Sequence, residues 1–208
     1  MIRGGPEDTK LIVLPSRLVE RLREVAARQG VSLSKYATEA LEQALRADSL
    51  GTSLGETVEL YRLMEVQRGA GAVHIPRSSL ERLLRELYPE NGEELRRVWH
   101  EAGRWYGEYL RTKLRDDDVL GFFEKALLVS WNLDEVEVRD EGGAVALRFA
   151  SFAMSLESTE LLLSYISGAM SSFGYGELER DCLRGLATAR YVRNRRNDAS
   201  NTGFKRSS

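Results

Sequence analysis

Residues 10–36 read KLIVLPSRLVERLREVAARQGVSLSKY. The run 10–14 is aliphatic and partly β-branched, which favours a short strand, and it ends at Pro15. Proline cannot donate a hydrogen bond to a strand ladder, but it fits the first turn of a helix. This stretch therefore predicts a strand followed directly by a helix.

Two helices are expected after the strand. Leu18, Leu22 and Val25 recur with the period of one helix face, up to about residue 29. Gly30 is placed to end that helix, and Ser32 is placed to cap a second helix that runs to about residue 47. One strand and two helices cannot bury this much apolar surface, so we expect a two-fold homodimer in which the two strands pair.

The order strand, Leu14-Pro15, helix, Gly30-Val31-Ser32, helix resembles a ribbon-helix-helix domain of the Arc/MetJ type over residues 9–47. The resemblance implies that the dimer binds double-stranded DNA with its ribbon in the major groove and the start of its second helix on a phosphate. The DNA-binding residues implied in the strand and at the helix start are Thr9, Lys10, Leu11, Val13, Ser32, Leu33, Ser34 and Lys35.

The apolar character of the strand departs from the pattern of that family. Leu11 and Val13 would face the bases, and apolar side chains cannot make the bidentate hydrogen bonds that distinguish base pairs. Two hypotheses stay open: the ribbon gains its affinity mainly from phosphate contacts, or the segment serves dimerisation only.

Residues 48–56 are small and rich in Gly and Ser, which indicates a linker. Residues 57–192 then show helical periodicity over about 56–68, 77–88, 92–114, 119–131 and 158–173, and two hairpins over 135–149 and 177–192. The expected fold class is α+β, with a ribbon-helix-helix dimerisation module followed by a mixed domain of helices and antiparallel sheet.

The second domain is similar to 4-vinyl-reductase-type ligand-binding domains. The residues that carry this weaker resemblance are Ala102-Gly103-Arg104, Ile166-Ser167-Gly168 and the pair Cys182 and Gly185. The resemblance implies a pocket between helices and sheet for a small apolar ligand. Some members hold zinc with several cysteines, and the lone Cys182 predicts that this metal site is absent.

Aromatic residues are concentrated between positions 99 and 131. They are either a hydrophobic core or the lining of a small-molecule pocket. The candidate pocket residues are Trp99, Trp105, Tyr106, Tyr109, Phe122 and Phe123. Gly103 and Gly107, one turn apart on the same expected helix, indicate either close helix packing or space for that ligand.

The net charge of −2 hides an uneven distribution along the chain. The balance is +2 over residues 1–47, −9 over 48–189 and +5 over 190–208. Residues 193–208 are expected to form a basic, disordered tail, and the acidic middle should lie away from DNA.

Several classes of protein are excluded or disfavoured. No nucleophile elbow, catalytic triad or phosphate-binding glycine loop is present, so we expect no enzymatic activity, no catalytic residues and no cofactor. No apolar run is long enough to cross a membrane, so a cytoplasmic protein without a membrane partner is expected. The sequence thus predicts a homodimeric transcription regulator with a ligand-sensing or assembly domain, or alternatively a ligand-binding or scaffold protein that uses residues 9–47 only to dimerise.

Overall fold

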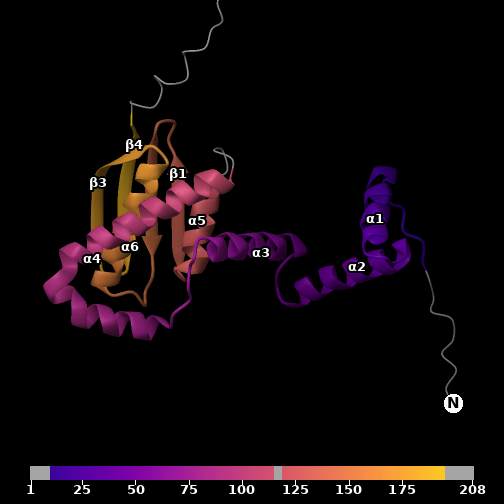
Figure 1. The fold of residues 1–208 in the computed structure, drawn as a ribbon, viewed down its shortest axis with the longest axis horizontal. Helices are drawn as coiled ribbons and strands as arrows, with labels where there is room; N and C mark the ends of the chain where they lie inside the picture. The colour runs from indigo at the N-terminus through magenta and orange to yellow at the C-terminus, as the bar shows by residue number, and fades with distance from the viewer. Residues whose placement is uncertain (1–9, 115–118, 195–208) are drawn as a thin grey trace, which may run out of the picture. The chain divides into compact units, whose positions relative to one another are not determined.

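The structure is a computed structural model, and it describes residues 10–114 and 119–194 (Figure 1). These residues contain six helices and one four-stranded antiparallel sheet, so the expected α+β class is confirmed. They divide into two compact units, residues 1–62 and 63–208, and the boundary falls inside helix α3. Each unit is described by itself below.

The N-terminal unit contains α1 (Ser16–Arg28) and α2 (Leu33–Ser49), as expected. Gly30 has φ +69° after α1, a conformation that glycine adopts without strain. Ser32 caps α2, since its Oγ accepts a hydrogen bond from the Lys35 N–H at 3.2 Å. Residues 10–15 form neither helix nor strand in the single chain. A strand is defined by hydrogen bonds to a second strand, so the paired ribbon stays a prediction.

The linker expected at residues 48–56 is shorter than predicted. Asp48 and Ser49 end α2, and α3 (Leu54–Gly69) begins after four intervening residues. The reason is a capping box: the Ser53 Oγ accepts from the Glu56 N–H at 3.1 Å, while the Glu56 carboxylate accepts from the Ser53 N–H at 2.8 Å.

The helices of the C-terminal unit follow the sequence pattern closely. They are α4 (Arg77–Lys113), α5 (Val119–Ser130) and α6 (Leu156–Ser172). The two helices expected on either side of Pro89 are one helix with a kink, because Asn91 has the non-helical angles φ −127° and ψ 17°. Pro89 lies inside this helix, two residues before the kink.

Two hairpins build the sheet. β1 (Glu135–Asp140) pairs with β2 (Ala144–Ala150), and β3 (Tyr175–Leu183) pairs with β4 (Leu186–Arg193). The second hairpin turns at Arg184 and Gly185 as predicted. β2 and β4 join the hairpins in the order β1-β2-β4-β3. Arg193 therefore ends a strand instead of beginning a tail, and residues 195–208 lie outside the described residues.

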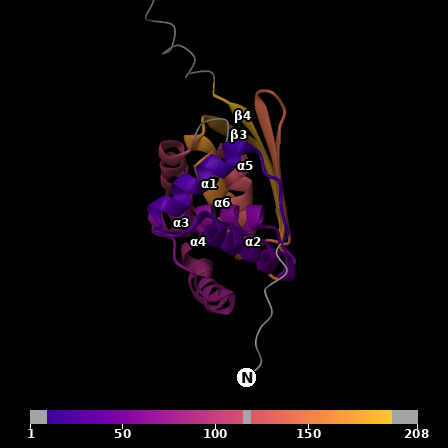
Figure 2. The same cartoon turned by 90° about the vertical axis from the view of Figure 1, so that its right-hand side faces the viewer.

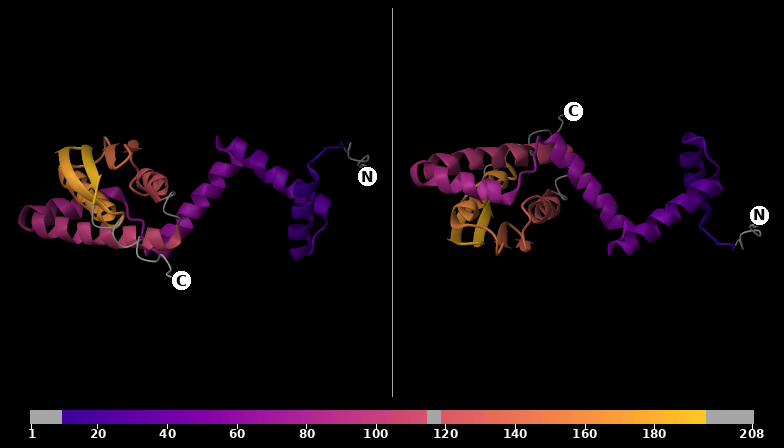
Figure 3. Two further views of the ribbon diagram at one scale, coloured as in Figure 1. Left: turned by 90° about the horizontal axis from the view of Figure 1, so that it is seen from above. Right: turned by 90° about the horizontal axis from the view of Figure 1, so that it is seen from below.

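The core lies between one face of the sheet and the helices. Alternate residues of β2 and β4 are buried, namely Val145, Leu147, Phe149, Ala187, Ala189 and Tyr191. Figures 1 and 2 show α5 and α6 on the same side of the sheet, with α4 crossing outside α6. Since α6 is enclosed between the sheet and α4, it is buried around most of its circumference. The same enclosure is visible from above and below in Figure 3. Among the described residues, no helix is both long and apolar enough to cross a membrane.

Candidate functional site

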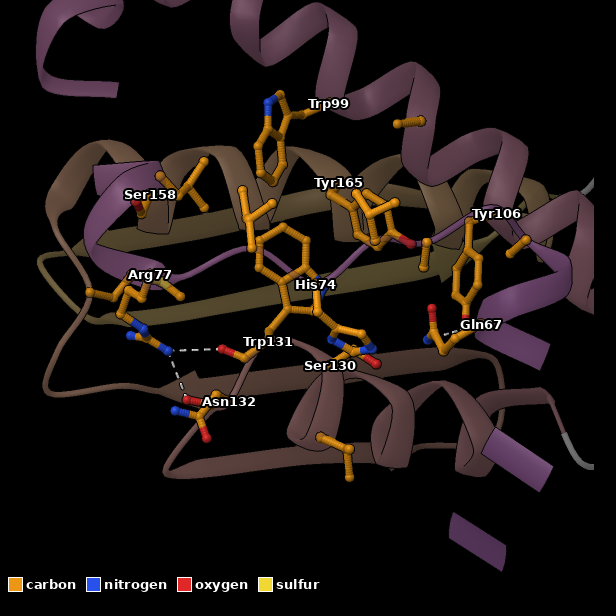
Figure 4. Close-up of a pocket in the computed structure, with 18 of the residues that line it drawn as sticks. Gln67, His74, Arg77, Trp99, Tyr106, Ser130, Trp131, Asn132, Ser158 and Tyr165 are labelled. Carbon is orange, nitrogen blue, oxygen red and sulfur yellow. Dashed lines mark hydrogen bonds between the residues drawn. The ribbon is translucent and has the colours of Figure 1, made fainter. Parts of the chain in front are cut away.

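A hollow in the C-terminal unit lies among α4, α6, the end of α5 and the segment 70–76 that joins α3 to α4 (Figure 4). Its volume is about 790 Å³, within the range of small-molecule pockets. The residues that line it are Gln67, Ala70, Ala72, Val73, His74, Ile75, Arg77, Leu80, Glu81, Trp99, Ala102, Trp105, Tyr106, Val129, Ser130, Trp131, Asn132, Met154, Ser158 and Tyr165.

Aromatic rings form a continuous wall of this cavity. Trp131 lies between Trp99 and Tyr165, with ring centroids 5.1 Å and 5.5 Å away. The ring of Tyr165 lies 5.9 Å from that of Tyr106. Since the chain has three tryptophans and Trp105 also lines the cavity, every tryptophan of the protein borders this space.

Polar groups at one end of the cavity join α3 to α4. The Gln67 side-chain amide donates to the Tyr106 hydroxyl at 2.8 Å, and both side chains are buried. Burial raises the pKa of the hydroxyls of Tyr106 and Tyr165 above the ordinary tyrosine range. Both hydroxyls therefore stay protonated at neutral pH and are available to donate.

The opposite end is fixed by Arg77, the first residue of α4. Its guanidinium donates to the Trp131 carbonyl oxygen at 3.0 Å, to the Asn132 carbonyl oxygen at 2.9 Å and to the Ser151 hydroxyl at 3.0 Å. These bonds hold the start of α4, and with it the segment 70–76, against the chain that leaves α5, as the dashed lines in Figure 4 mark. Nearby, the Glu81 carboxylate accepts from the Ser158 hydroxyl at 2.8 Å.

The predicted pocket residues divide into two groups. Trp99, Trp105 and Tyr106 line the cavity, as the pocket hypothesis requires. Tyr109, Phe122 and Phe123 do not, which corrects that part of the prediction. Tyr109 stacks on Trp105 at 5.6 Å, and the two phenylalanines are buried in the core because α5 turns them toward the sheet and its helices.

Several lining residues were missed. Trp131 follows directly after α5, and its place in the aromatic-rich stretch 99–131 is a signal that the sequence holds. Gln67, His74, Arg77 and Tyr165 come from segments far apart in the chain, and only the packing of α3, α4 and α6 brings them together.

The implied DNA-binding residues lie in the N-terminal unit. Ser32, Leu33, Ser34 and Lys35 form the cap and first turn of α2. Lys10, Leu11 and Val13 are exposed, and Thr9 lies outside the described residues.

A second hollow of about 480 Å³, between α4, α6 and β3, is lined mostly by residues with charged or hydroxyl groups. Its arginines already pair with acids: Arg96 with Glu160 at 3.1 Å, Arg97 with Glu94 at 2.5 Å and Arg180 with Glu177 at 3.4 Å. No set of three His, Cys, Asp or Glu side chains within residues 10–114 and 119–194 is arranged to hold a metal ion. Cys182 is half-buried on β3, and burial raises the pKa of its thiol.

Comparisons with known proteins include a weak structural likeness. No family model matches the chain, and no curated protein matches it. One solved structure, titled "Probing the function of heme distortion in the H-NOX family", aligns with a TM-score of 0.38 and 14% identity, covering 69% of this chain and 87% of that one. A TM-score of this size does not establish a shared fold.

Proposed function

We propose that the protein is a homodimeric DNA-binding regulator whose C-terminal unit binds a small apolar ligand. The proposed dimer is supported by the apolar surface that the N-terminal unit leaves exposed in the single chain. Within described residues 10–62, Ala26 and Ala47 alone are buried, whereas Ile12, Leu41 and Leu45 are 65%, 54% and 71% exposed. A second copy that pairs residues 10–14 and packs its α1 and α2 beneath them would cover these side chains.

The start of α2 supports a phosphate contact in such a dimer. The Ser32 Oγ already accepts from Lys35 N–H, while Leu33 and Ser34 lie in the first turn, where a helix supplies no acceptor for backbone N–H groups. Those groups and the Lys35 ammonium suit a phosphate, because the helix dipole adds positive potential there.

The cavity supports the sensing role. Its size and aromatic wall suit a small apolar molecule, and Gln67 connects it to the last turn of α3, the helix in which the two units meet in sequence. A ligand that binds more tightly when the bond between Gln67 and Tyr106 is formed, or when it is broken, would shift the protein toward that state. The resulting change in affinity for DNA is limited by the difference between the ligand's affinities for the two states.

Fluorescence polarisation with labelled genomic duplexes tests DNA binding. We expect binding at about 50 mM salt that weakens steeply toward about 200 mM, as counterion release requires. Because the dimer carries two copies of Lys35, Lys35→Ala should make the salt slope shallower by about 1.8, whereas Lys125→Ala on α5 should leave it unchanged. No binding to any duplex at about 50 mM salt would overturn the DNA-binding part of the proposal.

A second candidate is supported by one observation. Leu11 and Val13 are 93% and 87% exposed and apolar where base-reading side chains would be polar. A stable dimer that binds no duplex would favour a ligand-binding or scaffold protein in which residues 9–47 serve dimerisation only.

A further inference from the structure

The cavity contains two polar atoms whose hydrogen-bonding capacity the described residues leave unused. The Gln67 amide donates through its nitrogen to Tyr106, and its oxygen has no partner there although the side chain is only 8% exposed. The Tyr165 hydroxyl, in a largely buried side chain, likewise has no hydrogen-bond partner in residues 10–114 and 119–194. Every fully enclosed side-chain nitrogen or oxygen of those residues has a partner, so these two atoms keep some accessible surface, and both side chains line the cavity. Both therefore favour a hydrogen-bonding partner that enters it.

The two atoms lie at the same end of the cavity. Both side chains flank Tyr106, one by its hydrogen bond and the other by its ring at 5.9 Å (Figure 4). The amide oxygen can only accept a hydrogen bond, whereas the hydroxyl can donate one. Together they match a ligand edge that carries a donor beside an acceptor.

The rest of the lining disfavours a charged ligand. The Arg77 guanidinium is engaged by two carbonyl oxygens and a hydroxyl, and the Glu81 carboxylate by the N–H of Ser155 and the hydroxyl of Ser158. An ion that entered would lose its hydration, and Arg77 and Glu81, which carry opposite charges, would offer it no net counter-charge. The ring faces of the tryptophans instead suit a planar ring system.

Resting on the proposed ligand-binding function, we propose that the cavity binds an uncharged planar ring compound whose edge carries a hydrogen-bond donor beside an acceptor, as a ring lactam does. The Gln67 amide oxygen accepts from the ring N–H, and the Tyr165 hydroxyl donates to the ring carbonyl oxygen. The aromatic wall of Trp99 and Trp131 buries the ring faces.

A matched series of bicyclic probes tests this with the full chain. The probes are 2-quinolone with donor and acceptor, indole with a donor, quinoline with an acceptor, naphthalene with neither and 2-naphthoate with a negative charge. Tryptophan fluorescence is the readout, because all three tryptophans line the cavity. We expect 2-quinolone to bind about tenfold more tightly than naphthalene, and 2-naphthoate to bind least tightly.

Variants connect the preference to the two side chains. Tyr165→Phe and Gln67→Leu should each weaken 2-quinolone binding about fivefold while leaving naphthalene binding unchanged. Tyr61→Phe, an exposed tyrosine outside the cavity, is the control and should change neither.

The outcomes separate this inference from the function on which it rests. If naphthalene or 2-naphthoate binds as tightly as 2-quinolone, or if Tyr165→Phe weakens both probes equally, the cavity binds ligands but the donor–acceptor inference is wrong. If no probe binds, the proposed ligand-binding function is wrong, and this inference is wrong with it.

Discussion

Gly103 of α4 and Gly168 of α6 lie where the two helices touch backbone to backbone. A Cβ atom at Gly103 would overlap the carbonyl oxygen of Tyr165, and one at Gly168 would overlap that of His100. The sequence left open whether the α4 glycines serve helix packing or ligand space, and the answer is packing. This contact also sets the position of Tyr165, and therefore one side of the cavity.

Alanine at either glycine should destabilise the C-terminal unit. Gly103→Ala and Gly168→Ala each force the helices apart, which we expect to cost about 3 kcal/mol in the free energy of unfolding, measured by urea denaturation. Gly121→Ala on α5 is the control, because a Cβ added there would meet no neighbouring atom within 4 Å, and it should stabilise by about 0.5–1 kcal/mol. Equal effects at all three positions would contradict the packing role.

Arg77→Lys should loosen the wall of the cavity. A lysine cannot donate in a fork to the carbonyl oxygens of Trp131 and Asn132, so we expect a loss of about 2 kcal/mol in the free energy of unfolding. Acrylamide should then quench the tryptophans more strongly, since they line the same cavity as the segment 70–76. Arg82→Lys serves as the control, because Arg82 is exposed and pairs only with Glu86 at 3.4 Å. Quenching equal to that of the wild type would show that Arg77 does not hold the wall.

Three largely buried tyrosines with raised pKa values predict alkaline unfolding. Burial raises the pKa of Tyr106, Tyr165 and Tyr191 in the folded state, so the folded chain holds these protons more tightly than the unfolded chain. Their contribution to stability is therefore complete below about pH 10 and is lost as the pH rises further. Tyrosinate absorbance from these residues should appear together with the loss of helical circular dichroism. If all three ionise while the helices persist, their burial does not control the alkaline transition.

Charge on the exposed face of α2 should dissociate the proposed dimer. The double variant Leu41→Glu and Leu45→Glu places carboxylates where a second copy would bury leucines, and we expect monomers by sedimentation velocity. Glu42→Gln, on an exposed position of the same helix, should leave the dimer intact. If the double variant sediments like the wild type, Leu41 and Leu45 are not part of a dimer contact.

Local signals made most of the fold predictable. Gly30 and Ser32 mark the gap between α1 and α2, and the pair Gly142 and Gly143 marks the first hairpin turn with positive φ angles. The start of α3 could also be predicted, because Ser53 and Glu56 have the spacing of a capping box. The small residues of 48–56 favoured the linker interpretation instead.

The cavity was only partly predictable because its lining depends on how helices pack. An aromatic residue on a helix is either core or lining according to the neighbour that it meets. Phe123 faces the core and Trp99 faces the cavity, and periodicity treats the two alike. Gln67 carries no motif, and its role follows from a single hydrogen bond to a residue 39 positions away.

The central claim is that occupancy of the cavity controls DNA binding, and one titration measures this linkage. A labelled genomic duplex is titrated with the full chain at increasing 2-quinolone, with polarisation reporting DNA and tryptophan fluorescence reporting the cavity in the same sample. We predict that the dissociation constant for DNA changes by about 5- to 150-fold and levels off where the fluorescence change saturates. An unchanged dissociation constant for DNA at a saturated cavity would contradict the claim.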